Sequence, residues 1–410
     1  MPLNRVVITG CGAVSSFGLG VPLLVDGVWQ GRSGVRFMPE WQNIRGLTSL
    51  VAAPVPDLDT RELLPRSLRR TMGSMAVYAT LAAREAVATA GLSQEILHSG
   101  MVGVAIGSTT GSPQVYEDFY RSFLPAMSIE EQRSGTFFKL MGHSCAANVC
   151  LALGINGEQW APASACTSAS QAIGLGYLLI QSGRQSAMLC GGSDEVHSAV
   201  TIIFDVMKAA SRVHKEPLVT PRPFDKERDG VVCGGGSGVL VLESLDSAQS
   251  RGAKILCEVL GFGHVNDSQH MANPHESSME RAMRNAIKES NVSLSDIDYV
   301  NAHATGTLLG DIAESHAIHA VLGGNVPVSS FKGHIGHTLG AAGGLETILV
   351  LAMFNRQELA PTLHLKQPDP DCAPIAFVQS ICRHSLNTVI KNNFALGGVN
   401  TSLVLRRWTS

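Results

Sequence analysis

Two similar stretches, CGGGSGVLVLES at residues 233–244 and ALGGVNTSLVLRR at residues 395–407, stand near the ends of the two halves of the chain. Each has a glycine pair, then small or polar residues, then an extended apolar run typical of a strand. Each half also has a strand that leads into a small-residue helix start: APASACTSASQAIG at 161–174 and SSFKGHIGHTLGAAGG at 329–344. The repetition predicts one αβ unit used twice, joined near residues 247–254.

Short apolar, β-branched runs alternate with helical patterns along the chain. The expected strands are residues 5–10, 101–108, 186–193, 238–244, 296–303, 325–330 and 401–407. An Ala-rich helix is expected over 74–92, with Gly91 as its stop, and another helix over 278–290. This alternation predicts an α/β fold with largely parallel sheets covered on both faces.

Composition limits the class of protein. The 410 residues contain 31 Lys and Arg against 34 Asp and Glu, a net charge of −3, which argues against a nucleic-acid binder with a basic stripe. The nine cysteines include no CxxC pair, which favours a reducing cytoplasm over a disulfide framework. No stretch approaches the roughly 18 apolar residues of a membrane span, and the N-terminus lacks the long apolar run of a signal peptide. We therefore expect a cytoplasmic protein without a membrane span.

The opening VVITGCGAVSSFG, residues 6–18, has a strand followed by Gly10-x-Gly12, as in a dinucleotide-binding fingerprint. Ser15 stands where the third glycine belongs, and no phosphate-binding GxxxxGK[ST] motif occurs. We expect neither a nucleotide nor NAD to bind.

Cys166 lies between small residues, immediately before an apolar helical run. A helix N-terminus stabilises a thiolate through its free N–H groups and partial positive charge, so Cys166 is a candidate nucleophile. Ser164 or Thr167 is expected to cap this helix. The alternative is a buried structural cysteine.

Two histidines stand at similar junctions. His303 follows an apolar strand, and His337 comes five residues after Lys332, before a small-residue helix. Strand ends in α/β sheets are where sites form, so the histidines and Cys166 form a candidate constellation. The alternatives are a half-buried structural His303 and a solvent-facing His334. A zinc site of His334, His337 and Cys166 lacks the further carboxylate or thiolate that catalytic zinc usually has.

Four blocks resemble those of the type I/II β-ketoacyl-acyl-carrier-protein synthases: ACTSASQAIG (165–174), NAHATGTLLGDIAE (301–314), FKGHIGHTLGAAGGLE (331–346) and NNFALGGVNTSLVLRR (392–407). Residues 221–243 and 5–18 also match, and the blocks follow the family's order. The resemblance implies a thiolase-like fold, with two similar halves in a five-layered αβαβα arrangement. We place the N-terminal half at residues 1–248 and the C-terminal half at 249–410.

The resemblance implies a role for each matching residue. Cys166 would accept the acyl group, and His303 and His337 would complete a Cys-His-His triad. Lys332 matches the family's active-site lysine. The remaining matches are the charged supports Glu314 and Glu346, the pantetheine-binding Thr305 and Thr307, and Phe394, the first aromatic residue of the NxFxxGG turn.

The chain departs from the family pattern at two positions. Leu396 replaces the second phenylalanine of the glycine turn, which gates the acyl pocket in the family. Ala304 replaces the glycine of the usual His-Gly-Thr block. Neither change removes a proposed catalytic side chain, but the first bears on acyl-chain gating.

The implied reaction is a decarboxylative condensation that lengthens an acyl chain by two carbons, with no metal or redox cofactor. The expected partner is an acyl carrier protein, loaded with acyl or malonyl groups, docking on Arg66, Arg69 and Arg70. The alternative for these arginines is an ordinary solvated basic face. We expect a homodimer or a heterodimer with a chain-length-factor-like homologue.

The sequence bears on three alternatives to a housekeeping fatty-acid enzyme. A silent chain-length factor typically lacks the nucleophile, which this chain keeps. A degradative thiolase requires a second catalytic cysteine near the glycine turn, and the segment NNFALGGVN has none. The third alternative, the active subunit of a specialised polyketide or aryl-polyene ketosynthase, stays open, and Leu396 and Ala304 favour it.

Overall fold

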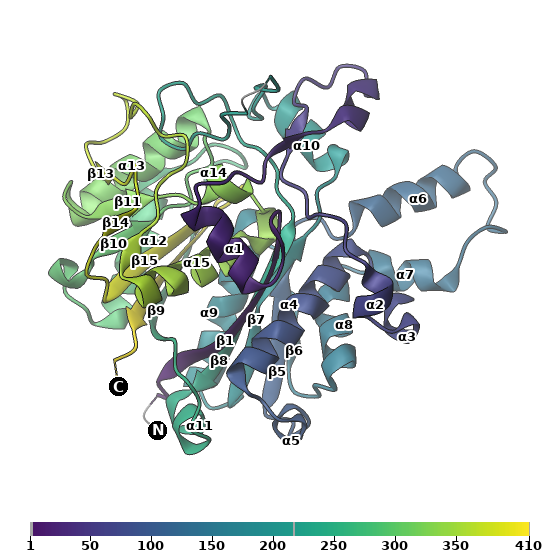
Figure 1. Cartoon of the computed structure of the whole chain (residues 1–410), viewed down its shortest axis with the longest axis horizontal. Helices are drawn as coiled ribbons and strands as arrows, with labels where there is room; N and C mark the ends of the chain where they lie inside the picture. Colours follow the sequence, from purple (N-terminus) through teal and green to yellow (C-terminus); the bar gives the residue numbers. More distant parts are fainter. Residues whose placement is uncertain (1–2, 216–217, 410) are drawn as a thin grey trace.

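A computed structural model of the protein describes residues 3–215 and 218–409. Within these residues, 12 strands form one continuous sheet (Figure 1). Its strands, from one edge to the other, are β13 (Ala376–Phe377), β11 (Pro327–Ser329), β10 (Tyr299–Asn301), β15 (Thr388–Phe394), β16 (Val399–Arg407), β9 (Cys257–Asn266), β1 (Val6–Ser15), β8 (Gly236–Ser244), β7 (Ala187–Asp194), β5 (Val102–Gly107) and β6 (Gln159–Trp160), with β2 (Gly18–Leu19) beside β1.

The strand order is the same in both directions from the centre of the sheet. Val6–Ile8 of β1 pairs antiparallel with Cys257–Val259 of β9. Outward from β1 come β8, β7, β5 and β6, and outward from β9 come β16, β15, β10 and β11. The two repeated stretches form β8 and β16, in equivalent positions, so the predicted duplication is confirmed. All seven expected strand runs contain a strand.

The prediction of largely parallel sheets holds only for the outer strands. Strands β5, β6 and β7 pair in parallel, as do β10, β11, β13 and β15. Strands β8 and β16 pair antiparallel with both of their neighbours. For β16 the reason is the short glycine-containing turn after β15, since a turn this tight returns the chain only in the antiparallel sense.

Helices cover both faces of each half of the sheet and also lie between the halves. Helices α9 (Ser168–Gln181) and α15 (Ala342–Arg356) pack on each other and on strands of both halves, so they form the central layer. Helices α4 (Ser74–Ala90) and α8 (Ser144–Leu153) cover the outer face of the N-terminal half, and α12 (Glu276–Ser290) and α13 (Leu308–Leu322) cover that of the C-terminal half (Figure 1). The result is five layers, and the expected helices at 74–92 and 278–290 are confirmed as α4 and α12.

Shorter elements connect these layers. The helices are α1 (Val21–Trp29), α2 (Thr60–Leu63), α3 (Arg66–Arg69), α5 (Gln94–Leu97), α6 (Pro113–Phe123), α7 (Ser134–Leu140), α10 (Ser198–Val206), α11 (Leu245–Ser250) and α14 (Lys332–Ile335). Two small antiparallel pairs are β3 (Arg36–Phe37) with β4 (Val51–Ala52) and β12 (Glu358–Leu359) with β14 (Cys382–Arg383).

The Gly10-x-Gly12 motif has a packing role in the fold. Both glycines lie inside β1, against α4, and a Cβ on Gly12 would be 2.0 Å from the carbonyl oxygen of Ala82. The same contact recurs in the other half, where a Cβ on Gly263 of β9 would be 1.9 Å from the carbonyl oxygen of Ala282 on α12. The glycines therefore let a helix approach its strand closely in both halves.

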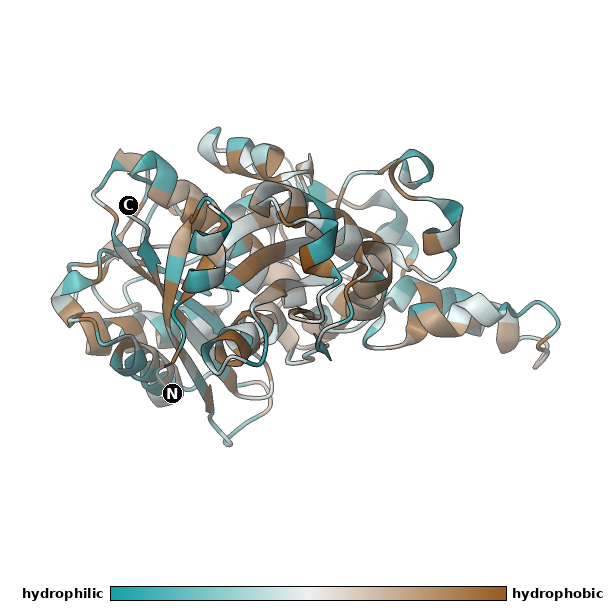
Figure 2. Ribbon diagram, turned by 90° about the horizontal axis from the view of Figure 1, so that it is seen from below, coloured by the Kyte–Doolittle hydropathy of each residue, from teal (hydrophilic) through white to brown (hydrophobic). Residues whose placement is uncertain are grey.

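Helices α6 and α7 form an arm that projects from the body of the molecule (Figures 1 and 2). The arm exposes large apolar side chains, namely Tyr116, Tyr120, Leu124, Met127, Ile129, Phe137 and Phe138. No sequence pattern predicted this arm. Across the described part of the chain, every helix is too short or too polar to cross a membrane.

Candidate active site

Cys166 and His337 occupy equivalent strand-to-helix junctions of the two halves. Cys166 lies in a 3-10 turn (Ala165–Thr167) that leads into α9, and His337 lies just before the 3-10 turn (Leu339–Ala341) that leads into α15. The residue that opens each turn has a left-handed backbone, with φ of 48° at Ala165 and 52° at Leu339. Such conformations are strained for residues other than glycine and persist only where the surrounding structure holds them.

The start of α9 differs from the expectation. Neither Ser164 nor Thr167 caps this helix with its side chain. Thr167 Oγ1 instead donates to the carbonyl oxygen of Ser164, and the Ser164 N–H donates to Ser168 Oγ. The tight 3-10 turn diverts these groups into local bonds, so α9 begins without a side-chain cap behind Cys166.

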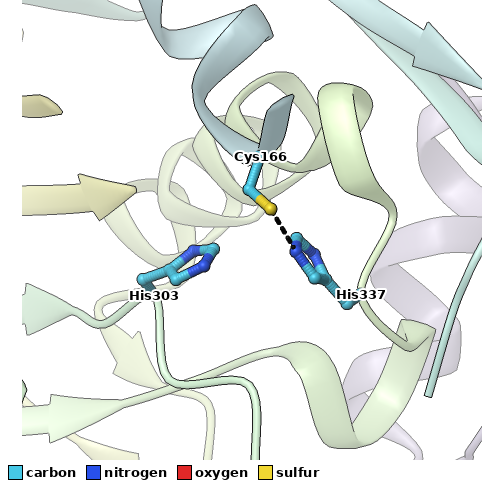
Figure 3. Close-up of side chains that lie close together, drawn as sticks. All are labelled: Cys166, His303 and His337. Carbon is cyan, nitrogen blue, oxygen red and sulfur yellow. Dashed lines mark hydrogen bonds between the residues drawn. The ribbon is translucent and has the colours of Figure 1, made fainter. Parts of the chain in front are cut away.

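The structure brings Cys166, His303 and His337 together in one buried pocket (Figure 3). The Cys166 Sγ is 2.9 Å from His337 Nε2. The sulfur and one ring nitrogen from each histidine all lie within 4.8 Å of one another. The His303 and His337 rings meet edge to face, with their centroids 5.2 Å apart. Residues far apart in the sequence, each at a predicted junction, thus share one space.

Both imidazoles are neutral near pH 7. Burial, together with the positive charge of Lys332, lowers the pKa of His337 to about 3 and holds the pKa of His303 well below its ordinary value. The backbone N–H of Leu339 donates to His337 Nδ1 over 3.3 Å. A neutral imidazole whose Nδ1 accepts carries its proton on Nε2, so His337 presents an N–H group to the Cys166 sulfur.

Burial also governs the thiol. It raises the pKa of Cys166 to about 12, although the Lys332 charge acts in the opposite direction. The resting thiol is therefore protonated, and its proton must leave when the sulfur attacks. The N–H of His337 is placed to stabilise the sulfur as negative charge develops on it.

Two lysines share one carboxylate behind the histidines. Lys332 Nζ lies 2.5 Å from Glu346 Oε1, and Lys391 Nζ lies 2.9 Å from Glu346 Oε2. All three groups are buried. Burial raises the pKa of Glu346, but the two ammonium groups outweigh it, so the net pKa is below the ordinary value and Glu346 is ionised.

Glu314 holds backbone instead of pairing with a lysine. Its carboxylate accepts the N–H groups of His303 at 2.8 Å and Ala304 at 2.6 Å. Burial raises the pKa of Glu314 to about 7. Asp311 accepts the N–H groups of Thr305 and Gly306 in the same way. These two carboxyls fix the loop that carries His303, a role that sequence spacing alone did not define.

The pocket has a volume of about 490 Å³. Its lining includes the predicted residues Cys166, His303, His337, Thr305, Thr307, Phe394 and Leu396, together with Ala304 and Glu314. Thr305 Oγ1 and Thr307 Oγ1 lie 3.1 Å apart, and the ring of Phe394 is 6.3 Å from that of His303. Both departures from the family pattern, Ala304 and Leu396, therefore line this pocket.

Other candidates lie elsewhere. Arg66, Arg69 and Arg70 stand on or next to α3 and do not belong to the pocket lining, and Arg69 Nε donates to the carbonyl oxygen of Leu64. The solvent-facing alternative for His334 is wrong, because its ring is buried between the carbonyl oxygens of Arg32 and Pro361, at 3.0 and 3.2 Å. His334 therefore does not join Cys166, as the zinc alternative required.

Sequence reasoning missed Lys391 and Asn393. Both lie on β15, whose residues Thr388–Phe394 are all buried, although the segment reads TVIKNNF. A run of one lysine and two asparagines in a strand with apolar residues on both sides was the available signal, because buried polar groups need partners.

A buried thiol and two neutral imidazoles thus lie together in a duplicated αβ fold, with Cys166 and His337 at equivalent junctions of the two halves. Residues 3–248 match the model described as "Beta-ketoacyl synthase, N-terminal domain", and residues 256–366 match "Beta-ketoacyl synthase, C-terminal domain". The chain belongs to the β-ketoacyl synthase family, and its fold is thiolase-like, as the resemblance implied.

Individual relatives agree. The chain is 33% identical over 409 residues to 3-oxoacyl-[acyl-carrier-protein] synthase 1 of Haemophilus influenzae, covering 99% of this chain and 100% of the relative. A crystal structure of a β-ketoacyl synthase from Burkholderia phymatum superposes with a TM-score of 0.96 at 40% identity, covering 99% and 100% of the two chains. The ishigamide ketosynthase/chain length factor gives a TM-score of 0.92 at 32% identity, again covering 99% and 100%.

Proposed function

We propose that this protein is a 3-oxoacyl-[acyl-carrier-protein] synthase that elongates a fatty-acid or polyketide chain by two carbons. The observation that carries the proposal is the 2.9 Å contact between Cys166 and His337 in a buried pocket that also holds His303. This arrangement supports catalytic roles for Cys166, His303 and His337, and Lys332 is the fourth proposed catalytic residue.

The first step is acyl transfer. The Cys166 sulfur attacks the thioester of an acyl-carrier protein, and the bond from the acyl carbon to the carrier sulfur breaks. The proton of the Cys166 thiol ends on the released carrier thiol. Covalent catalysis of this kind divides one difficult reaction into two easier ones.

The second step is decarboxylation of malonyl-carrier protein. The bond between the methylene and the carboxylate breaks, CO2 leaves, and the electron pair forms an enolate at the thioester. His303 and His337 donate N–H hydrogen bonds to the enolate oxygen without transferring a proton. Their low pKa values support this role, because neutral rings remain available across the physiological pH range.

The third step forms the new carbon–carbon bond. The enolate carbon attacks the acyl carbonyl on Cys166, and the 3-oxoacyl product leaves as Cys166 departs as a thiolate that regains a proton from solvent. We assign the oxyanion hole to the backbone N–H groups of Cys166 and Leu396, each worth about 3 kcal/mol in the transition state.

The pocket walls have separate roles in this proposal. Thr305 and Thr307 hold the pantetheine arm, supported by their position in the lining. Phe394 and Leu396 control entry of the acyl chain. Glu314 and Glu346 are supports, the first for the His303 loop and the second for Lys332.

The carrier protein docks, in this proposal, on Arg66, Arg69 and Arg70, of which Arg66 and Arg70 are exposed. We propose a homodimer or a heterodimer with a chain-length-factor-like homologue, and a cytoplasmic location supported by nine free cysteines. We also propose 1–248 and 249–410 as the two halves, supported by the mirrored strand order and by the matched ranges 3–248 and 256–366.

A second candidate is the active subunit of a specialised ketosynthase/chain-length-factor pair. The likeness to the ishigamide ketosynthase/chain length factor over 99% of this chain favours it, as does Leu396 in the pocket lining. The two candidates share the chemistry of Cys166 and differ in chain length and partner.

Purified protein incubated with malonyl-carrier protein and a panel of acyl-carrier proteins tests the proposal. Mass spectrometry of the carrier is expected to show 3-oxoacyl products two carbons longer than the starter, for at least one starter. Condensation only after addition of a co-expressed homologue supports the second candidate. No CO2 release and no elongation with any starter or partner would contradict both.

A further inference from the structure

Lys391 and Asn393 place a second polar group behind His303. They lie two residues apart on β15, so both side chains point to the same face of the sheet, whereas Asn392 points to the opposite face. Asn393 Nδ2 lies 3.3 Å from His303 Nδ1 and 3.0 Å from Glu346 Oε2. Asn393 Oδ1 accepts from Ser170 Oγ and from Lys391 Nζ.

The surroundings fix which way the Asn393 amide faces. A lysine ammonium only donates hydrogen bonds, so Lys391 must meet the amide oxygen. An ionised carboxylate only accepts, so Glu346 must meet the amide nitrogen. Because Lys391 and Glu346 are themselves ion-paired at 2.9 Å, a flipped amide would place donor against donor and acceptor against acceptor.

We propose that Asn393 is a positioning residue for His303: its amide donates to Nδ1 and holds the imidazole in the tautomer that carries its proton on Nε2. Within the described ranges, no residue hydrogen-bonds to Nε2 of His303, so this N–H is available to substrate. His337 reaches the same tautomer through the backbone N–H of Leu339. The two rings then present matching N–H donors to one oxygen.

The catalytic consequence of this inference rests on the proposed function. The tautomer of His303 does not depend on that function. Enolate stabilisation needs the His303 donor, whereas acyl transfer to Cys166 relies on His337. Loss of the Asn393 donor is therefore expected to slow decarboxylation selectively. Lys391 acts through Asn393, because it locks the amide and makes no contact with the substrate space.

The test compares Asn393→Leu, Asn393→Asp and the control Asn392→Leu in full-length protein. Asn392 is equally buried, but its side chain bonds Ser402 Oγ and contacts Met283, away from His303. Asn393→Leu should reduce malonyl-carrier decarboxylation at least 30-fold and change acyl loading of Cys166 by less than threefold. The control Asn392→Leu should change the rate of decarboxylation and the rate of acyl loading by the same factor.

NMR of protein with 15N-labelled histidine reports the tautomer directly. The wild-type protein should show a protonated Nε2 and an unprotonated Nδ1 at His303, assigned by the loss of its signals in His303→Gln. Asn393→Asp, which can only accept at neutral pH, should move the proton to Nδ1.

A His303 proton on Nδ1 in the wild-type protein overturns the inference, as does Asn393→Leu with unchanged decarboxylation. If Asn393→Leu does not fold, the tautomer of His303 in the wild-type NMR spectrum decides whether the inference holds. A protein that neither loads nor decarboxylates contradicts the proposed function, and the tautomer measurement still decides the role of Asn393.

Discussion

At the scale of single residues, burial controls the protonation of the proposed catalytic groups. It lowers the pKa of both histidines and raises the pKa of Cys166. The site therefore rests as a neutral thiol beside two neutral rings. Stabilisation of charge is reserved for the moment when the sulfur or the enolate becomes negative, which is where it accelerates the reaction.

The pKa of His337, lowered to about 3, predicts a dependence of stability on pH. In the unfolded chain this histidine binds a proton with a pKa near 6.5, so acid favours the unfolded state, and the stability lost grows as pH falls from 6.5 towards 3. Between pH 7.5 and 5.5, the wild-type protein should lose about 1 kcal/mol more unfolding free energy than His337→Asn. Guanidinium denaturation at the two pH values measures this difference, and equal losses would contradict a neutral buried His337.

The shared carboxylate of Glu346 predicts a large effect of its removal. Glu346→Gln leaves the buried Lys332 and Lys391 without a counter-charge and should reduce the unfolding free energy by about 3–5 kcal/mol. The control is Glu280→Gln, which breaks a pair with Arg284 at 2.7 Å on the surface of α12 and should cost less than about 1 kcal/mol. Similar losses in both variants, measured by denaturant unfolding, would show that the buried network is not stabilised by this carboxylate.

One physical reason explains why Lys391 and Asn393 could not be identified as site residues from the sequence. Cys166, His303 and His337 stand at strand ends, where sites are expected. Lys391 and Asn393 lie inside a strand, and their partners Glu346 and Ser170 are 45 and 223 positions away in sequence. Local pattern shows that such residues need partners, but only the tertiary fold shows which partners they have.

At the scale of elements, the duplication explains why the site lies at the centre. Helices α9 and α15 follow equivalent strands and pack against each other in the middle layer. Cys166 and His337 lie just before the starts of these two helices. Packing of the helices against each other therefore brings the thiol and the imidazole together. The strand and helix positions were predictable from β-branched runs and helical spacing. The mixed strand directions were not, because direction depends on the connections between strands.

The glycine contacts between β1 and α4 predict a specific sensitivity. Gly12→Ala would place a Cβ 2.0 Å from the carbonyl oxygen of Ala82, so strand and helix must separate. The expected loss of unfolding free energy is about 2–3 kcal/mol, by analogy with overpacked cores. Gly142→Ala is the control, since a Cβ there meets nothing within 4 Å. Thermal unfolding that places both variants at the wild-type midpoint would refute this account of the motif.

At the scale of the whole molecule, the α6–α7 arm and the distribution of charge bear on how the protein binds its partners. The α6–α7 arm projects beyond the body of the fold (Figure 2). Several of its large apolar side chains are exposed. The net charge of −3 gives little general attraction for an acidic carrier protein, so the proposed docking relies on a local basic patch. The family resemblance implied a docking patch on Arg66, Arg69 and Arg70, whereas no local sequence pattern predicted the α6–α7 arm.

The proposed docking patch predicts a change in carrier affinity. Arg69→Glu with Arg70→Glu should raise the apparent KM for acyl-carrier protein about tenfold and leave kcat within twofold, with the largest effect at low salt. The matched control reverses two exposed lysines, Lys254 after α11 and Lys288 in the last turn of α12. Both helices lie apart from α3 (Figure 1). An equal rise in KM for the control pair would attribute the effect to net charge instead of to the patch.

The central claim is that Cys166 carries the acyl chain during elongation. The most direct measurement is peptide-level mass spectrometry of the protein after incubation with an acyl-carrier thioester in the absence of malonyl-carrier protein. We expect one acyl group per chain, on the peptide that contains Cys166. This group should disappear when malonyl-carrier protein is added and should not form in Cys166→Ala. An acyl group on another residue, or elongation by Cys166→Ala at the wild-type rate, would contradict the claim.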